Sequence, residues 1–232
     1  MDDIELRDIR VCIDRKVPPK TANERMALVK GSLWPPNIGV TVSFLDGEEI
    51  LHQRVRDVAR QWEDYVAQLR FFFRDGVDRR ADIRISFTER GSWSYIGTDC
   101  LSITGDRPTM NFGWLSATSP EEELRRVVLH EFGHALGCLH EHQNPAGGIK
   151  WNKDAVYAYY AGPPNYWSKE DVDHNLFDVY NKDLTVYTSV DPRSIMMYPI
   201  DRRFTLDGLE VRLNTDLSDQ DKRFIGGPEA YG

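Results

Sequence analysis

The residues of this chain best suited to chemistry lie between His130 and His140, in the order H-E-x-x-H-x-x-G-x-x-H. On a helix, His130 and His134 lie one turn apart on the same face, so their imidazoles can bind one cation. Gly137 permits the left-handed turn that ends such a helix, after which His140 can approach the same metal from another side. Three neutral imidazoles with an open fourth position are typical of catalytic zinc. We therefore predict one catalytic zinc ion bound by His130, His134 and His140.

Glu131 directly follows the first of these histidines, so its carboxylate can reach a water on the metal without binding the metal itself. A carboxylate in that place can take a proton from the water as the water attacks a carbonyl, and pass it to a leaving amine. The pattern therefore predicts a zinc-dependent peptidase with Glu131 as general base. Ordinary histidines without a metal would require a chance match at five fixed positions, so we favour the metal site.

A second short segment, Ser194–Pro199 with the sequence SIMMYP, follows the histidines in the chain. With it, the sequence resembles the metzincin metallopeptidases, and among them the astacin family, in which a glutamate such as Glu141 directly follows the third histidine. By this resemblance Met196 is the methionine of the Met-turn beneath the metal. By the same resemblance Tyr198 is a catalytic tyrosine that can bind the zinc, swing away and stabilise the oxyanion.

The resemblance extends over roughly residues 40 to 231. Trp93–Gly97 resembles the upper rim of the astacin cleft, where the strand bearing Tyr95 would pair with an extended substrate. Leu217–Asp221 resembles the start of the last helix. Astacins usually carry two disulfides, whereas the cysteines of this chain are too few for a disulfide framework; they are Cys12, Cys100 and Cys138. This departure indicates a bacterial-type member of the family.

Hydrophobic spacing locates the elements that must position these residues. Runs at 40–45, 71–73, 83–87, 93–97 and 110–115 predict strands, and helical spacing over about 48–69 predicts an amphipathic helix. Ser119, Pro120 and Glu122 predict a capping box at the start of the zinc helix. In its middle, Gly133 suggests a close backbone approach by a neighbouring strand. A strand, a helix, four strands and a helix in that order predict a mixed sheet with two helices on it.

The fold class that the resemblance implies is α+β and zincin-like: a mixed, twisted five-stranded sheet with two long helices above a loop-rich C-terminal subdomain. We expect an N-terminal extension over 1–30 lying along the surface, an N-terminal subdomain over 31–137 and a C-terminal subdomain over 138–232, with the active-site cleft between the two subdomains. The last of these would hold the third histidine, the Met-turn, a short helix over 153–160 capped by Asn152, and a final helix beginning near Ser218. We expect the aromatic residues over 151–167 to pack inside it rather than to stack on nucleic-acid bases.

Composition narrows the choice of partners. The chain has 29 lysines and arginines and 37 aspartates and glutamates, which gives a formal net charge of −8. This charge disfavours binding to nucleic acids or anionic membranes. We expect protein or peptide substrates, no nucleic-acid or membrane partner, and a monomer. One of Arg193, Arg202 and Arg203 could favour an acidic residue just after the cut. The N-terminus has no hydrophobic signal segment, although the resemblance implies a secreted, extracellular protein; a cytoplasmic protein is the alternative.

Two other functions stay open at this stage. One is a catalytically silent binding module with a zincin fold, against which the retention of Glu131 argues. The other is a latent enzyme blocked by its own N-terminal segment, with the thiolate of Cys12 or the carboxylate of Asp14 at the open metal position. The competing interpretation is that residues 11–13 add an apolar strand or patch, with Cys12 buried or paired to Cys100.

Overall fold

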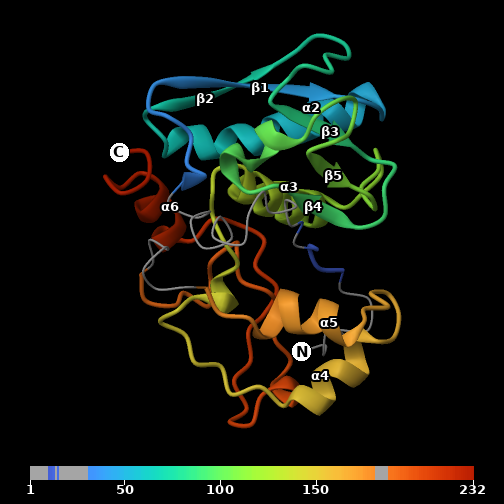
Figure 1. The fold of residues 1–232 in the computed structure, drawn as a ribbon, viewed down its shortest axis with the longest axis vertical. Coiled ribbons are helices and arrows are strands. Elements are labelled where there is room, and N and C mark those ends of the chain that lie inside the picture. Colours follow the sequence, from blue (N-terminus) through green and yellow to red (C-terminus); the bar gives the residue numbers. More distant parts are fainter. Residues whose placement is uncertain (1–9, 14, 16–30, 181–187) are drawn as a thin grey trace.

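The computed structural model describes residues 10–13, 15, 31–180 and 188–232, so Asp14 lies outside the described residues. Figure 1 shows an upper part built on a sheet with the long helices, and a lower part in which short helices are joined by long loops. Among the described helices, none has the length and the apolar composition needed to cross a bilayer.

The upper part is a five-stranded sheet in the order β2-β1-β3-β5-β4. Its strands are β1 (Ile38–Phe44), β2 (Leu69–Phe73), β3 (Ile83–Ser86), β4 (Ser92–Ser94) and β5 (Met110–Phe112). Neighbouring strands run parallel except β4, which runs antiparallel to β5 at one edge. The mixed five-stranded sheet predicted from the sequence is therefore confirmed.

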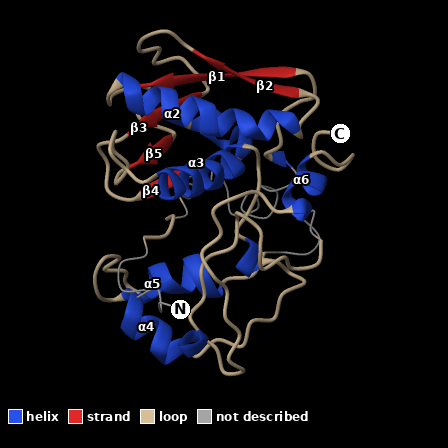
Figure 2. Ribbon diagram, turned by 180° about the vertical axis from the view of Figure 1, so that it is seen from behind, coloured by secondary structure: helices blue, strands red, loops and turns tan. Residues whose placement is uncertain are grey.

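The helices α2 (Glu49–Ala59) and α3 (Glu121–Ala135) contact each other and cover the sheet, as Figure 2 shows from behind. Alternate residues of β1 supply the apolar face beneath them: Val40 and Val42 are 0% exposed. The core of the upper part thus lies between β1, β3, β5 and these two helices. The apolar face of a sheet is buried in this way by helices that are themselves apolar on one side.

The predicted helix over 48–69 is wrong in its length. α2 ends at Ala59 and continues as a 3-10 helix over Arg60–Asp64, after which the chain turns into β2. The Trp62 indole donates to the carbonyl of Leu129 on α3 at 3.0 Å, so the tighter turn serves to place this side chain under the zinc helix. Helical periodicity continued in the sequence because Val66 and Leu69 are also buried, although they lie in the loop and strand that follow.

The predicted capping box of the zinc helix is also wrong. α3 begins at Glu121 after Pro120, and no side chain caps its N-terminus. The Ser119 hydroxyl instead accepts a hydrogen bond from the backbone of Ser116 at 2.9 Å, within the preceding turn. The early glutamates of α3 still stabilise the positive end of the helix dipole.

The C-terminal end of α3 follows the prediction. Gly137 has φ +95°, and its N–H bonds to the carbonyl of His134 while the N–H of Cys138 bonds to that of Gly133. These are the two hydrogen bonds of a Schellman motif, in which glycine adopts the left-handed conformation at little cost. The close neighbour of Gly133 is a side chain rather than a strand: a Cβ there would lie 2.5 Å from the sulfur of Met196.

The lower part contains α4 (Lys153–Tyr160) and α5 (Lys169–Val172), whereas α6 (Asp219–Ile225) lies beside the upper part, whose apolar core includes Ile225 (Figure 1). Asn152 caps α4 by accepting from the N–H of Ala155, as predicted, and Ser218 forms a capping box with Asp221 at the start of α6. A second apolar cluster, which we call the lower cluster, includes Val156, Tyr160, Met197 and Tyr198. The aromatic residues expected to pack here largely do so, although Tyr166 is 62% exposed.

The lower cluster also contains Val11 and Cys12, which are only 4% and 5% exposed. The expectation that the first thirty residues lie along the surface is therefore wrong for this described stretch. A segment with two adjacent buried residues is anchored by apolar contacts, and here the neighbours come from both the lower cluster and α3.

Candidate active site

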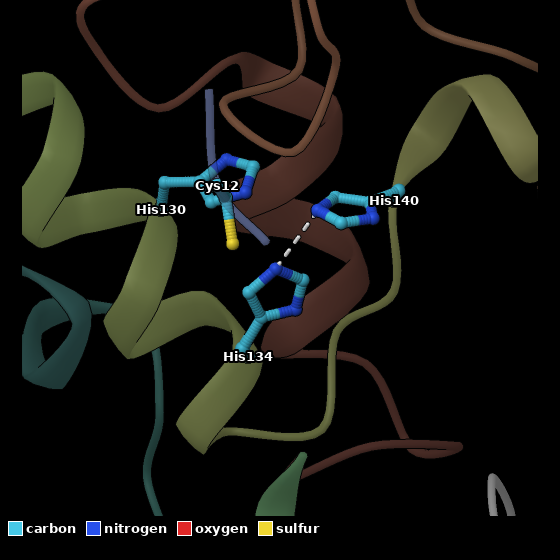
Figure 3. A group of neighbouring side chains, drawn as sticks. All are labelled: Cys12, His130, His134 and His140. Atoms are coloured by element: carbon cyan, nitrogen blue, oxygen red, sulfur yellow. Dashed lines mark hydrogen bonds between the residues drawn. The ribbon is translucent and has the colours of Figure 1, made fainter. Parts of the chain in front are cut away.

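The three histidines of the motif converge on one point between the upper and lower parts. His130 and His134 project from the last turns of α3, and His140 returns from the loop after Gly137 (Figure 3). Their ring centroids are 4.8 Å apart for His130 and His134 and 4.6 Å apart for His134 and His140. All three are buried, at 6%, 0% and 1% exposed.

Cys12 completes this group from a distant part of the chain. One ligand atom from each of Cys12, His130, His134 and His140 lies within 4.8 Å of the others, and Figure 3 shows the sulfur directed toward the space between the imidazoles. The Cys12 thiol also lies 3.3 Å from Oε2 of Glu131. Of the two alternatives for Cys12, buried or paired to Cys100, the structure has the first, since Cys12 is 5% exposed and neither cysteine is joined in a disulfide.

The hydrogen bonds behind the imidazoles suit a metal. Nδ1 of His130 lies 2.8 Å from the carbonyl of Ile195, and Nδ1 of His134 lies 2.9 Å from that of Cys138. A carbonyl can only accept, so each Nδ1 carries its proton and each Nε2 presents a lone pair. Nε2 of His130 is buried with no hydrogen-bond partner among the described residues, and Nε2 of His134 and His140 are 3.1 Å apart. Three imidazole nitrogens that converge on one buried point are the arrangement that a zinc ion satisfies.

Burial keeps His130 and His140 in the neutral form that binds metal. Desolvation, and then the neighbouring His134, lower the pKa of His130 and of His140 well below the usual value. A buried imidazolium would lack water, so the neutral form is favoured. The donor set, its burial and its protonation therefore all fit one zinc ion.

Glu131 and Tyr198 lie at the same point. Glu131 is 1% exposed and follows His130 on α3. Tyr198 donates from its hydroxyl to the backbone carbonyl of Cys12 at 2.5 Å, and its ring centroid lies 4.5 Å from that of His140. The structure thus brings Glu131 and Tyr198 together with the three histidines, and Cys12 of the N-terminal segment lies among them.

The loop that carries Met196 is attached to both α3 and α6. The carbonyl of Met196 accepts from the N–H of Glu141 at 3.0 Å, and its sulfur lies against Gly133. The carboxylate of Asp221, on α6, accepts from the Ser194 hydroxyl at 2.6 Å and from the N–H of Ile195 at 2.8 Å. Because the carbonyl of Ile195 orients His130, the start of α6 helps to position the metal site.

Sequence reasoning missed the groups that orient the site. His142 is buried between His140 and Tyr198, with ring centroids 5.3 Å and 4.4 Å away, and desolvation lowers its pKa to about 4. Its Nε2 lies 2.7 Å from the carbonyl of Asn175. No sequence signal marks Asn175 or the carbonyl of Ile195 as partners, because any residue type supplies a carbonyl.

Comparison with known proteins gives close structural matches. No family model and no curated protein sequence matches the chain. Among solved structures, one of myroilysin matches with a TM-score of 0.81 at 44% identity, over 85% of this chain and 95% of that one. A crystal structure of myroilysin matches with a TM-score of 0.66 at 42% identity, over 93% of this chain and 89% of that one. High choriolytic enzyme 1, a hatching enzyme zinc-protease from the medaka fish Oryzias latipes, matches with a TM-score of 0.56 at 16% identity, over 84% of this chain and 93% of that one. At this identity the match shows a likeness of fold.

A mixed sheet above a helix that ends in H-E-x-x-H, with a third histidine after a glycine turn, defines a metzincin-type metallopeptidase. Zinc is the metal of this class, and the buried histidines fit it. The chain belongs to the astacin-like zinc metallopeptidases, and it is similar to myroilysin over most of its length.

Proposed function

We propose that the protein is an endopeptidase that cuts protein or peptide chains with Glu131 as its general base. The observation that carries the proposal is the place of this carboxylate: buried, next to His130 on α3, and 3.3 Å from the sulfur that lies among the three imidazoles. Zinc held by His130, His134 and His140 would supply a Lewis acid and would bring the pKa of a bound water toward about 7. Glu131 would take a proton from the attacking water and deliver it to the amine that leaves.

Tyr198 is proposed to hold the oxygen of the carbonyl under attack. Its hydroxyl already donates to a peptide carbonyl in the cleft, that of Cys12, at 2.5 Å. A donor in this place can strengthen its hydrogen bond as negative charge develops on a substrate oxygen. Its second role as a zinc ligand, and the role of Met196 as the Met-turn residue beneath the metal, remain proposals that rest on the resemblance.

The edge strand β4 is proposed to bind the substrate main chain. The N–H of Ile13 donates to the carbonyl of Ser92 at 3.0 Å, so this edge already accepts an extended segment. Strand addition to a sheet edge uses main-chain hydrogen bonds and therefore accepts many sequences. The strand was predicted over 93–97 but spans Ser92–Ser94, so Tyr95 lies one residue beyond its end.

We propose in addition that the full chain is a latent form of this enzyme, which is a state of the peptidase rather than another function. Cys12 lies where a fourth metal ligand would lie, contacts the general base, and offers its carbonyl to Tyr198. A thiolate is a good zinc ligand, so the segment would compete with water for the open position. The silent binding module is the weaker candidate, because Glu131 is present and buried beside the histidines.

Four forms of the full chain test both proposals: the parent, Glu131→Gln, Cys12→Ser, and Cys138→Ser as a matched control for loss of a thiol. Cleavage of a denatured protein is measured with and without a chelator, alongside zinc content. We expect Cys12→Ser to raise activity and Cys138→Ser to leave it unchanged. Glu131→Gln should keep zinc and lose activity by about 10²–10⁴-fold. Zinc-loaded variants that never cleave would contradict the peptidase, and equal activity in parent and Cys12→Ser would contradict latency.

A monomer that acts outside the cell is the remaining proposal. The net charge of −8 supports the expectation that neither nucleic acid nor an anionic membrane is the partner. Size measurement in solution and fractionation of cells and medium test the oligomeric state and the location.

A further inference from the structure

We propose that the recess around Val11 is the subsite for the residue just after the scissile bond, and that it selects a branched aliphatic side chain because Glu123 neutralises Arg126 at its edge. This inference rests on the proposed endopeptidase function and specifies its substrates. Its two specificity-determining residues, Glu123 and Arg126, lie one helical turn apart on α3.

The recess is apolar and fits the side chain that it holds. Val11 is 4% exposed, and the residues around it come from four separate segments of the chain. The apolar lining comes from Trp114, Val127, Ile195, Met197 and Leu213. Burial of an aliphatic side chain in such surroundings is favourable, so the recess has the chemistry of an aliphatic subsite.

The place of the recess relates it to the bond that is cut. It is lined also by His130 and Glu131, so it begins at the metal site itself. Glu131 must deliver a proton to the amine that leaves, and that amine belongs to the residue following the cut. The side chain of this residue therefore enters the recess that Glu131 borders, which is the place of Val11 in the full chain.

Arg126 is the arginine that lines this recess in the described structure, rather than Arg193, Arg202 or Arg203. Its side chain is only 11% exposed, and its Nε and one terminal nitrogen donate to the two carboxylate oxygens of Glu123 at 3.1 Å and 2.7 Å. An arginine left unpaired in such a place would attract an acidic substrate residue, but here its charge is already balanced.

Glu123 is itself held in this orientation. The Trp114 indole donates to its Oε1 at 2.9 Å, and the remaining donor capacity of Arg126 includes a bond of 3.2 Å to the carbonyl of Arg10. Arg126 is therefore a fixed part of the wall, and Glu123, which does not line the recess, balances its charge. A neutral wall with apolar lining discriminates against Asp and Glu by the cost of burying an unpaired charge.

The first experiment identifies the cut sites in a denatured protein by mass spectrometry, with the full chain carrying Cys12→Ser. We expect Val, Ile and Leu after the cut to be enriched over Asp and Glu by about tenfold or more. Adding Glu123→Gln should shift this ratio toward acidic residues by about tenfold, and adding Arg126→Gln to that variant should restore it. Glu122→Gln, at an exposed neighbouring position, is the matched control and should not change the ratio.

Cleavage without an aliphatic preference, or a preference that Glu123→Gln leaves unchanged, would overturn this inference while the peptidase stands. If no variant cuts at all, the peptidase proposal fails. A second measurement that needs no catalysis then tests whether the recess prefers an aliphatic side chain. In the zinc-loaded full chain, the rate at which Cys12 reacts with a thiol reagent, mapped by mass spectrometry, reports how firmly the segment is docked.

In this second measurement we compare Val11→Ile, Val11→Asn and Val11→Asp. The first should leave the labelling rate of Cys12 nearly unchanged, and Val11→Asp should raise it by about tenfold or more because a charge enters an apolar recess. Glu123→Gln should reduce the effect of Val11→Asp, since Arg126 can then pair with the new carboxylate, and should not reduce that of Val11→Asn. An equal effect of Val11→Asp in both backgrounds would overturn the role of the ion pair.

Discussion

Replacement of Gly133 by alanine tests whether the Met196 loop supports the zinc helix by direct contact. At an unobstructed helix position this change is stabilising by about 1 kcal/mol, because alanine has the higher helix propensity. Here a Cβ would lie 2.5 Å from the Met196 sulfur and 3.2 Å from Cζ2 of Trp62. Ordinary contacts between such atoms are about 3.5–4.0 Å long, so the sulfur would have to move by about 1 Å or more.

The surroundings decide which effect is larger. Met196 and Trp62 are 3% and 1% exposed and both line a cavity, so the fixed backbone of the Met196 loop, rather than an absence of space, limits how far the sulfur can move. The loop itself is held, since the N–H of Met196 donates to the Ser194 hydroxyl and its carbonyl accepts from Glu141, both at 3.0 Å. Overpacking of a full core costs about 1–3 kcal/mol, and the anchored loop places Gly133→Ala toward the upper end. After subtraction of the propensity gain, we expect a net destabilisation of about 1–2 kcal/mol.

The assay is equilibrium unfolding in urea, with the change read from the midpoint and slope. The matched control is Gly133→Ala combined with Met196→Ala: with the sulfur removed, the alanine should become tolerated, giving a coupling of about 1 kcal/mol or more. Zinc affinity of Gly133→Ala should also fall, because Ile195, next to the displaced residue, holds Nδ1 of His130 at 2.8 Å. A gain in stability of about 1 kcal/mol for the single variant would refute the contact argument.

Three further predictions concern the metal, the reaction and the final helix. His140→Ala should reduce the zinc content well below one ion per chain by elemental analysis; full retention would make the buried His142 the next candidate ligand. Tyr198→Phe should keep zinc and lower turnover by about 10²–10³-fold, and unchanged turnover would leave Tyr198 as a packing residue. Asp221→Ala should lower the free energy of unfolding by about 3 kcal/mol in the same urea assay, because three hydrogen-bond donors lose the carboxylate that accepts from them. The control, Asp219→Ala at an exposed position of the same helix, should change it by under about 0.5 kcal/mol.

Local spacing was enough to predict the parts of the site that lie within one element. His130 and His134 share a face because the helix repeats every 3.6 residues. Gly137 ends that helix with φ +95° because the left-handed conformation is costly for other residues. The order of strands and helices also followed from hydrophobic period, and it is the order that the structure has. These features depend on interactions between residues a few positions apart, which a sequence displays directly.

The wrong predictions came where a local signal competed with packing. Buried residues at helical spacing continue past Asp64, but Val66 and Leu69 are buried by the start of β2 rather than by a helix. Ser119 has the residue type and place of a helix cap, yet its hydroxyl bonds within the turn before Pro120. The sequence correctly indicated that Val66 and Leu69 are buried and that the Ser119 hydroxyl forms a hydrogen bond. It indicated the wrong neighbours for both, a helix for the first and a helix N-terminus for the second.

By itself, the sequence determined the metal-binding motif and, through the family resemblance, the class of fold, and it singled out Glu131 as the proposed general base. Only the tertiary structure decided that Cys12 lies beside Glu131, 119 positions away, and that Tyr198 holds the carbonyl of Cys12 across 186 positions. It likewise decided that Val11 fills a recess lined by Arg126, and that Glu123 pairs with this arginine. Such contacts form only when the sheet, α3 and the lower cluster have packed together, so no short-range pattern encodes them.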